Sequence, residues 1–255
     1  MIDLMSARAV LAAAGPASAA AVGTVPQAAT SANVRRKHRR RGSAPLPTRG
    51  KLPEWSIDGR VDVVSDYRPG GISSTDGKPA LQAELNLTHR SGLFAGAFAS
   101  HLARNGGERV ELDLSAGYSV RRGKATLSAQ STAYLFPGVP NSSYLEVQAG
   151  AAREFGAATV GASAAWCPPQ ANIGGRANLY LGLDATLPVK RTPLVLDAAI
   201  GRENGAFGNR KLDWSIGGRV LLSRFELSLA YEDARRTGHA PHSGATVIGG
   251  VAFLF

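Results

Sequence analysis

Residues 109–120 read RVELDLSAGYSV, and apolar and polar side chains alternate along them one by one. The apolar members are Val110, Leu112, Leu114, Ala116 and Tyr118, and the polar or small members are Glu111, Asp113, Ser115, Gly117 and Ser119. A period of two is typical of a β-strand, because successive side chains point to opposite faces, whereas the 3.6-residue period of a helix would scatter both sets. This stretch predicts a strand with one apolar and one polar face.

The same alternation recurs along the rest of the chain. We expect strands at about 55–66, 80–89, 92–101, 109–120, 124–136, 143–153, 157–166, 176–187, 192–201, 211–222, 224–233 and 244–255. The expected short connections are 90–91, 121–123, 154–156, 188–191 and Ser223, and the longer ones are 67–79, 102–108, 137–142, 167–175, 202–210 and 234–243. Short and longer connections therefore alternate.

This sorting of connections is typical of up-and-down outer-membrane barrels, which have tight periplasmic turns and longer extracellular loops. Runs of about ten residues also match a tilted strand that crosses the hydrocarbon core. We therefore predict an all-β fold, an antiparallel up-and-down transmembrane β-barrel of about 12 strands over residues 55–255, with both of its ends on the periplasmic side. A soluble β-protein is the alternative architecture.

Aromatic residues support a membrane location. Those near the ends of the expected strands are Trp55, Tyr118, Trp166, Tyr180, Trp214 and Tyr231. Such residues form interfacial girdles, although Tyr180 falls on the polar register of its strand and is not expected to belong to one. Phe253 and Phe255 share the apolar face of the last run, which resembles the terminal signature of bacterial outer-membrane proteins. That resemblance implies that the outer-membrane assembly machinery recognises them.

The basic charge of the chain is concentrated before the strands. The whole sequence has 29 Lys and Arg against 19 Asp and Glu, a formal net charge of +10. Residues 1–50 hold eight of the bases and one acid, so they carry +7 and residues 51–255 carry +3. The single cysteine excludes a disulfide scaffold and a zinc site of the CxxC type. No stretch approaches the roughly 18 apolar residues of a membrane-spanning helix.

The first 54 residues show no strand pattern. Residues 1–21 form an Ala-rich, signal-like segment in which Ala17-Ser18-Ala19 fits a cleavage site; an Ala-rich extension or a start assigned too far upstream is the alternative. Residues 22–54 are predicted to be a disordered basic linker, because the charged run 35–41 has no apolar face. Polyanion binding by this run is a weaker reading, and no specific nucleic acid is expected as a partner.

Residues 65–82, SDYRPGGISSTDGKPALQ, resemble the opening motif of the TorF-like porin family, small outer-membrane barrels of proteobacteria. Shorter similarities include ELDL at 111–114, Phe136-Pro137-Gly138 and Asp213-Trp214, so the resemblance covers about 55–255. It implies a barrel in the bacterial outer membrane with a transport role. It also marks a motif loop made of Asp66, Tyr67, Arg68, Gly71, Asp76, Gly77, Lys78 and Pro79.

The polar faces of the strands are mainly acidic. If the apolar faces point to lipid, the inward acids are Asp58, Asp62, Glu84, Glu111, Asp113, Glu146, Asp184, Asp197, Asp213, Glu226 and Glu232. Within the runs, only Arg60 and Arg219 oppose them, because most other bases fall in connections or at run ends. Carboxylates that line a pore stabilise cations, so these residues are candidates for a cation-favouring lumen. The alternative is a packed interior in which the acids are paired and little is conducted.

Nothing in the sequence points to an enzyme or a cofactor. His239 and His242 lie beside Ser243 in a stretch interrupted by proline, and Cys167 begins a Pro-rich connection without a companion base. We therefore expect a porin-like channel for passive diffusion of small solutes or ions. The alternatives are a non-conducting structural or adhesive barrel and a soluble β-protein with a polyanion-binding tail. The expected partners are outer-membrane lipid, the assembly machinery and the diffusing solutes or ions.

The basic tail is predicted to be separable from the barrel. Deletion of residues 31–50 behind a working signal should leave the melting temperature of the barrel unchanged, because these residues contribute no alternation. A large drop in melting temperature would contradict this prediction.

Overall fold

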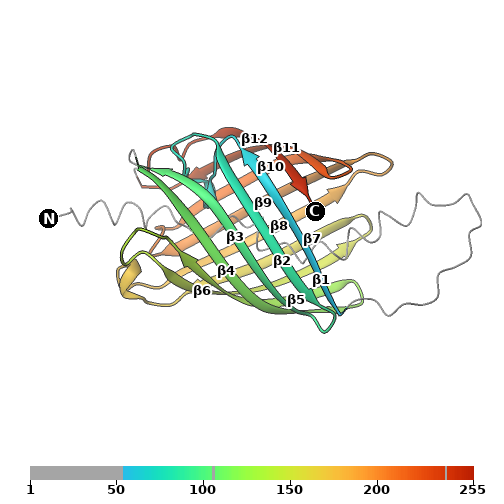
Figure 1. The fold of residues 1–255 in the computed structure, drawn as a ribbon, viewed down its shortest axis with the longest axis horizontal. Coiled ribbons are helices and arrows are strands. Elements are labelled where there is room, and N and C mark those ends of the chain that lie inside the picture. Colours follow the sequence, from blue (N-terminus) through green and yellow to red (C-terminus); the bar gives the residue numbers. More distant parts are fainter. Residues whose placement is uncertain (1–53, 105–106, 239) are drawn as a thin grey trace, which may run out of the picture.

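The chain folds into a closed antiparallel barrel of twelve strands (Figure 1), seen in a computed structural model that describes residues 54–104, 107–238 and 240–255. The strands are β1 (Trp55–Val64), β2 (Ala80–His89), β3 (Leu93–Arg104), β4 (Gly107–Arg122), β5 (Ala125–Leu135), β6 (Tyr144–Phe155), β7 (Ala158–Cys167), β8 (Asn178–Pro188), β9 (Leu194–Gly205), β10 (Lys211–Leu222), β11 (Phe225–Arg235) and β12 (Thr246–Leu254). The signal-like segment 1–21 and all of the expected linker 22–54 except Glu54 lie outside the described residues.

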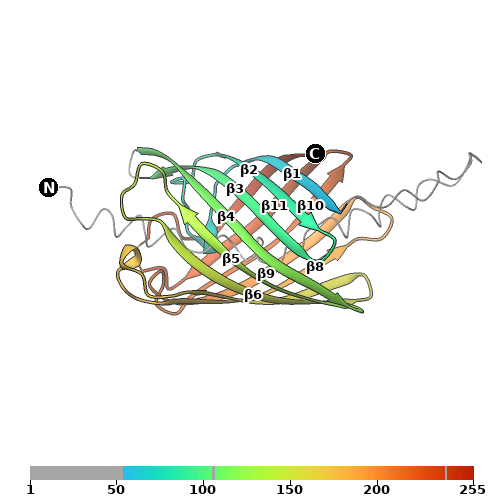
Figure 2. The ribbon, with the colours of Figure 1, turned by 60° about the horizontal axis from the view of Figure 1, so that its bottom comes forward.

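The order of the strands confirms the predicted up-and-down topology. Each strand pairs with its neighbours in the chain, and β1 pairs with β12 to close the sheet. Two short 3-10 turns, η1 (Pro69–Gly71) and η2 (Ala171–Ile173), lie in the connections. Figure 2, turned from the first view, shows the tilted strands continuing around the barrel.

The connections sort into two ends. The turns 90–92, 123–124, 156–157, 189–193 and 223–224 gather at the right of Figure 1, and we call this the turn end. The connections at the opposite side, which we call the loop end, are mostly longer. One sequence expectation is wrong here. The stretch 102–108 is not a long loop, because the alternation continues and β3 pairs with β4 as far as Arg104 and Gly107.

Two further boundaries differ from the sequence expectation. The pairing of β8 with β9 continues to Gly205, so the connection expected at 202–210 is shorter. Cys167 does not begin a loop, because it pairs with Asn178 as the last residue of β7 and is buried. The alternation of apolar and polar residues is weak in both places. The residues stay in the sheet because their backbone groups pair with those of the adjacent strand.

The outer surface of the barrel is apolar. Exposed Leu, Val, Ile and aromatic side chains occupy the outward register of every strand, and on β3 Leu93 is followed by alanines. Trp55, Tyr118, Trp166 and Tyr231 are exposed near strand ends, as expected of girdle residues. Tyr180 is only 3% exposed and faces inward, as its register predicted. The described residues contain no helix long and apolar enough to cross a membrane.

Backbone pairing between Gly59 and Phe255 extends the seam that closes the barrel. The two residues exchange hydrogen bonds of 3.0 and 3.1 Å, and the Phe255 ring lies over Gly59 on the outer face. A Cβ at Gly59 would come within 2.6 Å of that ring. Phe255 also stacks at 6.4 Å on Phe253, which contacts Phe225 at 5.5 Å. The seam is therefore covered by an aromatic row that needs a glycine beneath it.

Phe255→Ala is expected to lower the yield of folded barrel, because it removes the ring that covers the seam. Gly59→Ala should lower the yield in the native chain, and it should do so less in a Phe255→Ala background, where the ring is absent. The measurement is heat-modifiable gel migration after refolding into vesicles. Normal yield for Phe255→Ala, or equal effects of Gly59→Ala in both backgrounds, would show that the ring does not support closure.

Candidate functional site

The lumen gathers the charged side chains that the sequence analysis singled out. All of them occupy the inward register of their strands; they are Asp58, Arg60, Asp62, Glu84, Glu111, Asp113, Glu146, Asp184, Asp197, Asp213, Arg219, Glu226 and Glu232. That they line a conducting path stays a prediction. Their common orientation follows from the strand period, which sends every second side chain to the same face.

Four more charged residues point inward that sequence reasoning did not place there. Lys211 and Glu203 lie at the loop-end limits of β10 and β9, Arg109 lies near the start of β4, and Arg68 belongs to the β1–β2 connection. Arg109 and Lys211 share the register of Glu111 and Asp213 within the expected runs, and the register of 192–201 extended by two residues would have shown Glu203. Nothing in the local pattern would have shown Arg68.

Lys211 and Glu203 form a buried ion pair. Lys211 Nζ lies 2.7 Å from Glu203 Oε2 and donates a 2.9 Å hydrogen bond to the carbonyl oxygen of Gly70. Asn178 Nδ2 donates to Glu203 Oε1 at 3.0 Å. The Lys211 and Glu203 side chains are 2% and 0% exposed. Because Gly70 belongs to the β1–β2 connection, this pair ties that loop to the ends of β9 and β10.

The β1–β2 connection, residues 65–79, folds into the barrel instead of projecting from it. Tyr67 packs against Phe98 on β3 with ring centroids 6.0 Å apart, while Gly71 lies against Ala234 on β11. Gly71 has φ +78°, and a Cβ there would come within 2.7 Å of the Ala234 methyl group. A glycine is needed at this position for both reasons. The loop therefore spans the lumen from β3 to β11.

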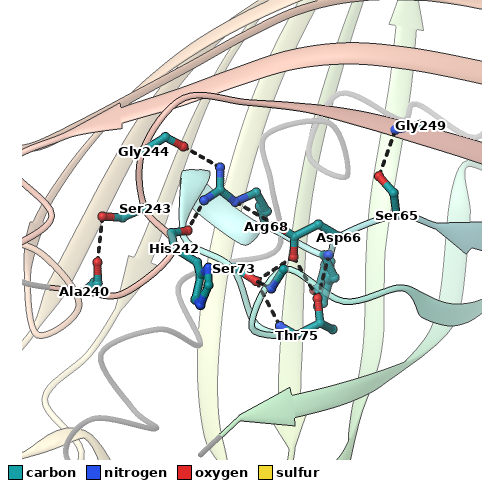
Figure 3. A network of polar contacts seen from close by, with 12 residues as sticks. Ser65, Asp66, Arg68, Ser73, Thr75, Ala240, His242, Ser243, Gly244 and Gly249 are labelled. Atoms are coloured by element: carbon teal, nitrogen blue, oxygen red, sulfur yellow. Dashed lines mark hydrogen bonds and ion pairs between the residues drawn. The ribbon is translucent and has the colours of Figure 1, made fainter.

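Polar contacts hold this loop in place (Figure 3). The Asp66 carboxylate accepts hydrogen bonds from the hydroxyls of Ser73 and Thr75 and forms an ion pair with Arg68 at 3.1 Å. Arg68 also donates to the carbonyl oxygens of Gly244, at 2.7 Å, and His242. Two loop-end connections that are far apart in the sequence are thus locked together through one guanidinium group.

The last four motif residues form an exposed turn. Asp76, Gly77, Lys78 and Pro79 lead into β2, where Lys78 donates its backbone N–H to the Thr75 carbonyl oxygen and its side chain is exposed.

Tyr67, in contrast, is buried in the lumen. Burial, with the negative charges of Glu111 and Asp113 nearby, raises the pKa of the Tyr67 hydroxyl well above its ordinary value. It therefore stays neutral at physiological pH.

Aromatic side chains fill the loop-end part of the lumen. Tyr134 stacks on Tyr144 at 4.7 Å, and Tyr144 contacts Phe207 from the β9–β10 connection at 5.1 Å. Phe136 and Ile173 from neighbouring connections complete this cluster, and all five side chains are buried. The strands and connections at this end therefore form a packed core inside the barrel, which narrows any path through it.

Carboxylates border the aromatic cluster without a cation. The Glu146 carboxylate accepts hydrogen bonds from Gln148 at 2.6 Å and from the Tyr134 hydroxyl at 3.2 Å. Glu111 and Asp113 are also buried, and among the described residues no Lys, Arg or His forms an ion pair with any of the three acids. These three acids therefore lie beside the aromatic cluster without a basic partner among the described residues.

The turn-end half of the lumen is more exposed, and both of its strand-borne arginines Arg60 and Arg219 form ion pairs. Arg60 Nε lies 2.8 Å from Asp62 Oδ2, and its Nη2 lies 3.1 Å from Glu226 Oε1. Arg219 reaches Asp197 at 3.4 Å. The Arg60 and Arg219 side chains are 26% and 24% exposed. This end resembles a solvated mouth, whereas the loop end resembles a protein core.

The described His and Ser side chains that stand close together form local contacts. His89 Nδ1 contacts Ser91 Oγ at 2.8 Å, but the Ser91 N–H donates to the same nitrogen at 3.3 Å, so the ring stabilises the β2–β3 turn. Ser243 bonds to Thr237 and Ala240. Within the described ranges, no three His, Cys, Asp or Glu side chains are placed to hold a metal ion.

The buried Lys211–Glu203 pair gives a stability prediction. Lys211→Met or Glu203→Gln should each lower the free energy of unfolding by about 3–5 kcal/mol, because each leaves one buried charge without its partner. The double variant should lose clearly less than the sum. Urea unfolding in lipid vesicles measures these values, and strictly additive losses would contradict the pairing.

Solved structures share this architecture. A structure described as the KdgM porin superimposes with a TM-score of 0.55 at 6% identity and covers 78% of this chain and 98% of the porin. The KdgM porin in complex with disordered oligogalacturonate gives 0.56 at 6% identity, with coverage of 78% and 98%. The NanC porin gives 0.53 at 9% identity, with coverage of 78% and 99%. These likenesses establish the fold of outer-membrane porins.

Sequence comparison places the chain in a family without assigning an activity. No curated protein matches the sequence. The resemblance to TorF-like porins stays a prediction, since the matching family description does not name them. The family match covers residues 52–250. The chain belongs to the family described as bacterial protein of unknown function (Gcw_chp).

Proposed function

We propose that this protein is an outer-membrane channel for passive diffusion of small solutes or ions, with a lumen that favours cations. The observation that carries the proposal is a set of inward carboxylates without basic partners inside a barrel with the porin fold. The motif resemblance to TorF-like porins agrees with a transport role.

Charge pairing in the lumen supports the cation preference. The described inward bases Arg60, Lys211 and Arg219 form ion pairs with strand acids, and Arg68 pairs with Asp66 of its own loop. Eight strand acids form no ion pair with a described base; they are Asp58, Glu84, Glu111, Asp113, Glu146, Asp184, Asp213 and Glu232. Arg109 on β4 is a further inward base, and it forms no ion pair with a described residue.

The lumen charges should outweigh the formal charge of the chain. Charges that line a narrow path with low-dielectric walls dominate its field, whereas a tail and exposed loops are screened within about 8 Å at physiological salt. The positive net charge therefore does not imply an anion channel. The aromatic packing at the loop end favours small permeants over large solutes.

The same packing is the observation that favours the second candidate function, a non-conducting structural or adhesive barrel. Tyr134, Tyr144 and Phe207 leave little room where the channel would open. Planar-bilayer recording of the purified full chain separates the two. Conductance supports the channel, and its absence in protein shown to be folded by heat-modifiable migration supports the scaffold.

The ion preference is tested by the reversal potential in a salt gradient. We expect cation preference in the native chain and a clear loss of it in the Glu111→Gln/Asp113→Asn variant, because two unpaired lumen charges are removed. Glu54→Gln/Asp76→Asn removes the same formal charge at the two ends of the barrel, away from Glu111 and Asp113, and should leave the reversal potential unchanged. Anion preference in the native chain, or equal shifts in both variants, would contradict the proposed role of the lumen.

A further inference from the structure

Basic side chains surround the turn end of the barrel. Eight exposed Lys and Arg residues lie in or beside its short turns; they are Arg90, Arg121, Arg122, Lys124, Arg153, Lys190, Arg191 and Arg224. Two have acidic partners, in the pairs Arg90–Glu54 at 3.1 Å and Arg121–Glu154 at 2.8 Å. The other six form no ion pair with a described residue.

Three of these unpaired bases cluster around the β4–β5 turn, and two of them are on the outer face. Arg122 on β4 pairs across the sheet with Ala125 on β5, and Ala125 pairs with Arg153 on β6. The two arginines therefore flank a single small residue, about 10 Å apart at two strand spacings. Lys124 lies in the turn immediately before Ala125. Three positive charges thus surround the small side chain of Ala125, and none of them is paired with a described acid.

The position of the cluster matches the headgroup region of a membrane. Arg153 lies over the Phe155 ring, with its Cζ 5.5 Å from the ring centroid. Phe155 is exposed on the outer face and is closer to the turn than Arg153. The Arg153 side chain therefore runs along an aromatic ring toward the interface, as long basic side chains do when their backbone lies deeper in the bilayer.

An alanine surface adjoins the cluster on its membrane side. Ala151 and Ala149 follow Arg153 on the outward register of β6, and they pair with Ala162 and Ala164 of β7. Larger side chains border this block, with Leu127 on β5 next to Ala151 and Leu183 on β8 next to Ala162. The four alanines thus form a shallow depression between larger side chains, and its turn-end limit adjoins the basic cluster.

We propose that Arg122, Lys124 and Arg153 bind the phosphate headgroup of an anionic phospholipid, whose acyl chain lies on the alanine surface. Unpaired bases at this depth are complementary to a charged headgroup, and each Lys or Arg near an anionic surface contributes about 1 kcal/mol. The small side chains leave space for a chain alongside the strand. A soluble polyanion would use the bases without the alanine surface.

Native mass spectrometry of the full chain tests this site with two lipids that share acyl chains, palmitoyl-oleoyl phosphatidylglycerol and palmitoyl-oleoyl phosphatidylcholine. The native chain should retain phosphatidylglycerol in preference. Arg122→Gln/Lys124→Gln/Arg153→Gln should weaken that retention roughly fivefold per base removed. Lys78→Gln/Arg202→Gln/Arg210→Gln, which neutralises three exposed bases at the loop end, should retain it as the native chain does.

Two further arms identify the ligand. Ala151→Phe keeps all three bases but fills the alanine surface, so it should also weaken retention of phosphatidylglycerol. Inorganic phosphate at the lipid concentration should not displace the lipid. Heat-modifiable migration confirms that each variant is folded. Equal retention of both lipids, native-like retention in the turn-end triple variant or in Ala151→Phe, or displacement by phosphate alone would overturn the proposal.

Discussion

Closure of the sheet between β1 and β12 is the constraint on which the rest of the structure depends. In lipid an unpaired strand edge would leave a row of backbone groups without hydrogen bonds, at a cost of several kcal/mol each. The register from Arg60–Leu254 to Val64–Gly250 joins the two edge strands. The Gly59–Phe255 hydrogen bonds extend that join toward the turn end. In the closed sheet, each strand side chain points either outward to lipid or inward to the lumen.

This division explains why the lumen is both charged and crowded. Apolar residues face outward, so the loop-end interior has to be filled by polar strand residues and by connections that fold inward. The ion pair of Lys211 with Glu203 and the contacts of Arg68 satisfy part of the buried charge there. The Tyr134–Tyr144–Phe207 cluster supplies the apolar packing. Eight of the strand charges left without ion-pair partners are carboxylates, against the base Arg109, and this excess gives the proposed channel its sign.

The fold could be predicted from the sequence because the period of two persists through nearly all strands. The weak points were the ends of strands, such as Glu203, which lies two residues beyond the expected run 192–201 but still belongs to β9. The expectation of a long loop at 102–108 was wrong because β3 and β4 continue to pair with each other through most of this stretch. The inward path of the β1–β2 connection was beyond sequence reasoning. Arg68 binds carbonyl groups 174 and 176 residues away, and no local pattern records such contacts.

The assignment of inner and outer faces is the central claim, and adjacent residues on β2 test it directly. Asn86→Cys and Leu85→Cys, each in a Cys167→Ser background, are compared in vesicles with a charged, membrane-impermeant thiol reagent. Asn86 faces the lumen and Leu85 is exposed on the outer surface. We predict that the cysteine at 86 is labelled and that the cysteine at 85 is protected by lipid until the protein is unfolded. Labelling at 85 with protection at 86 would contradict the account.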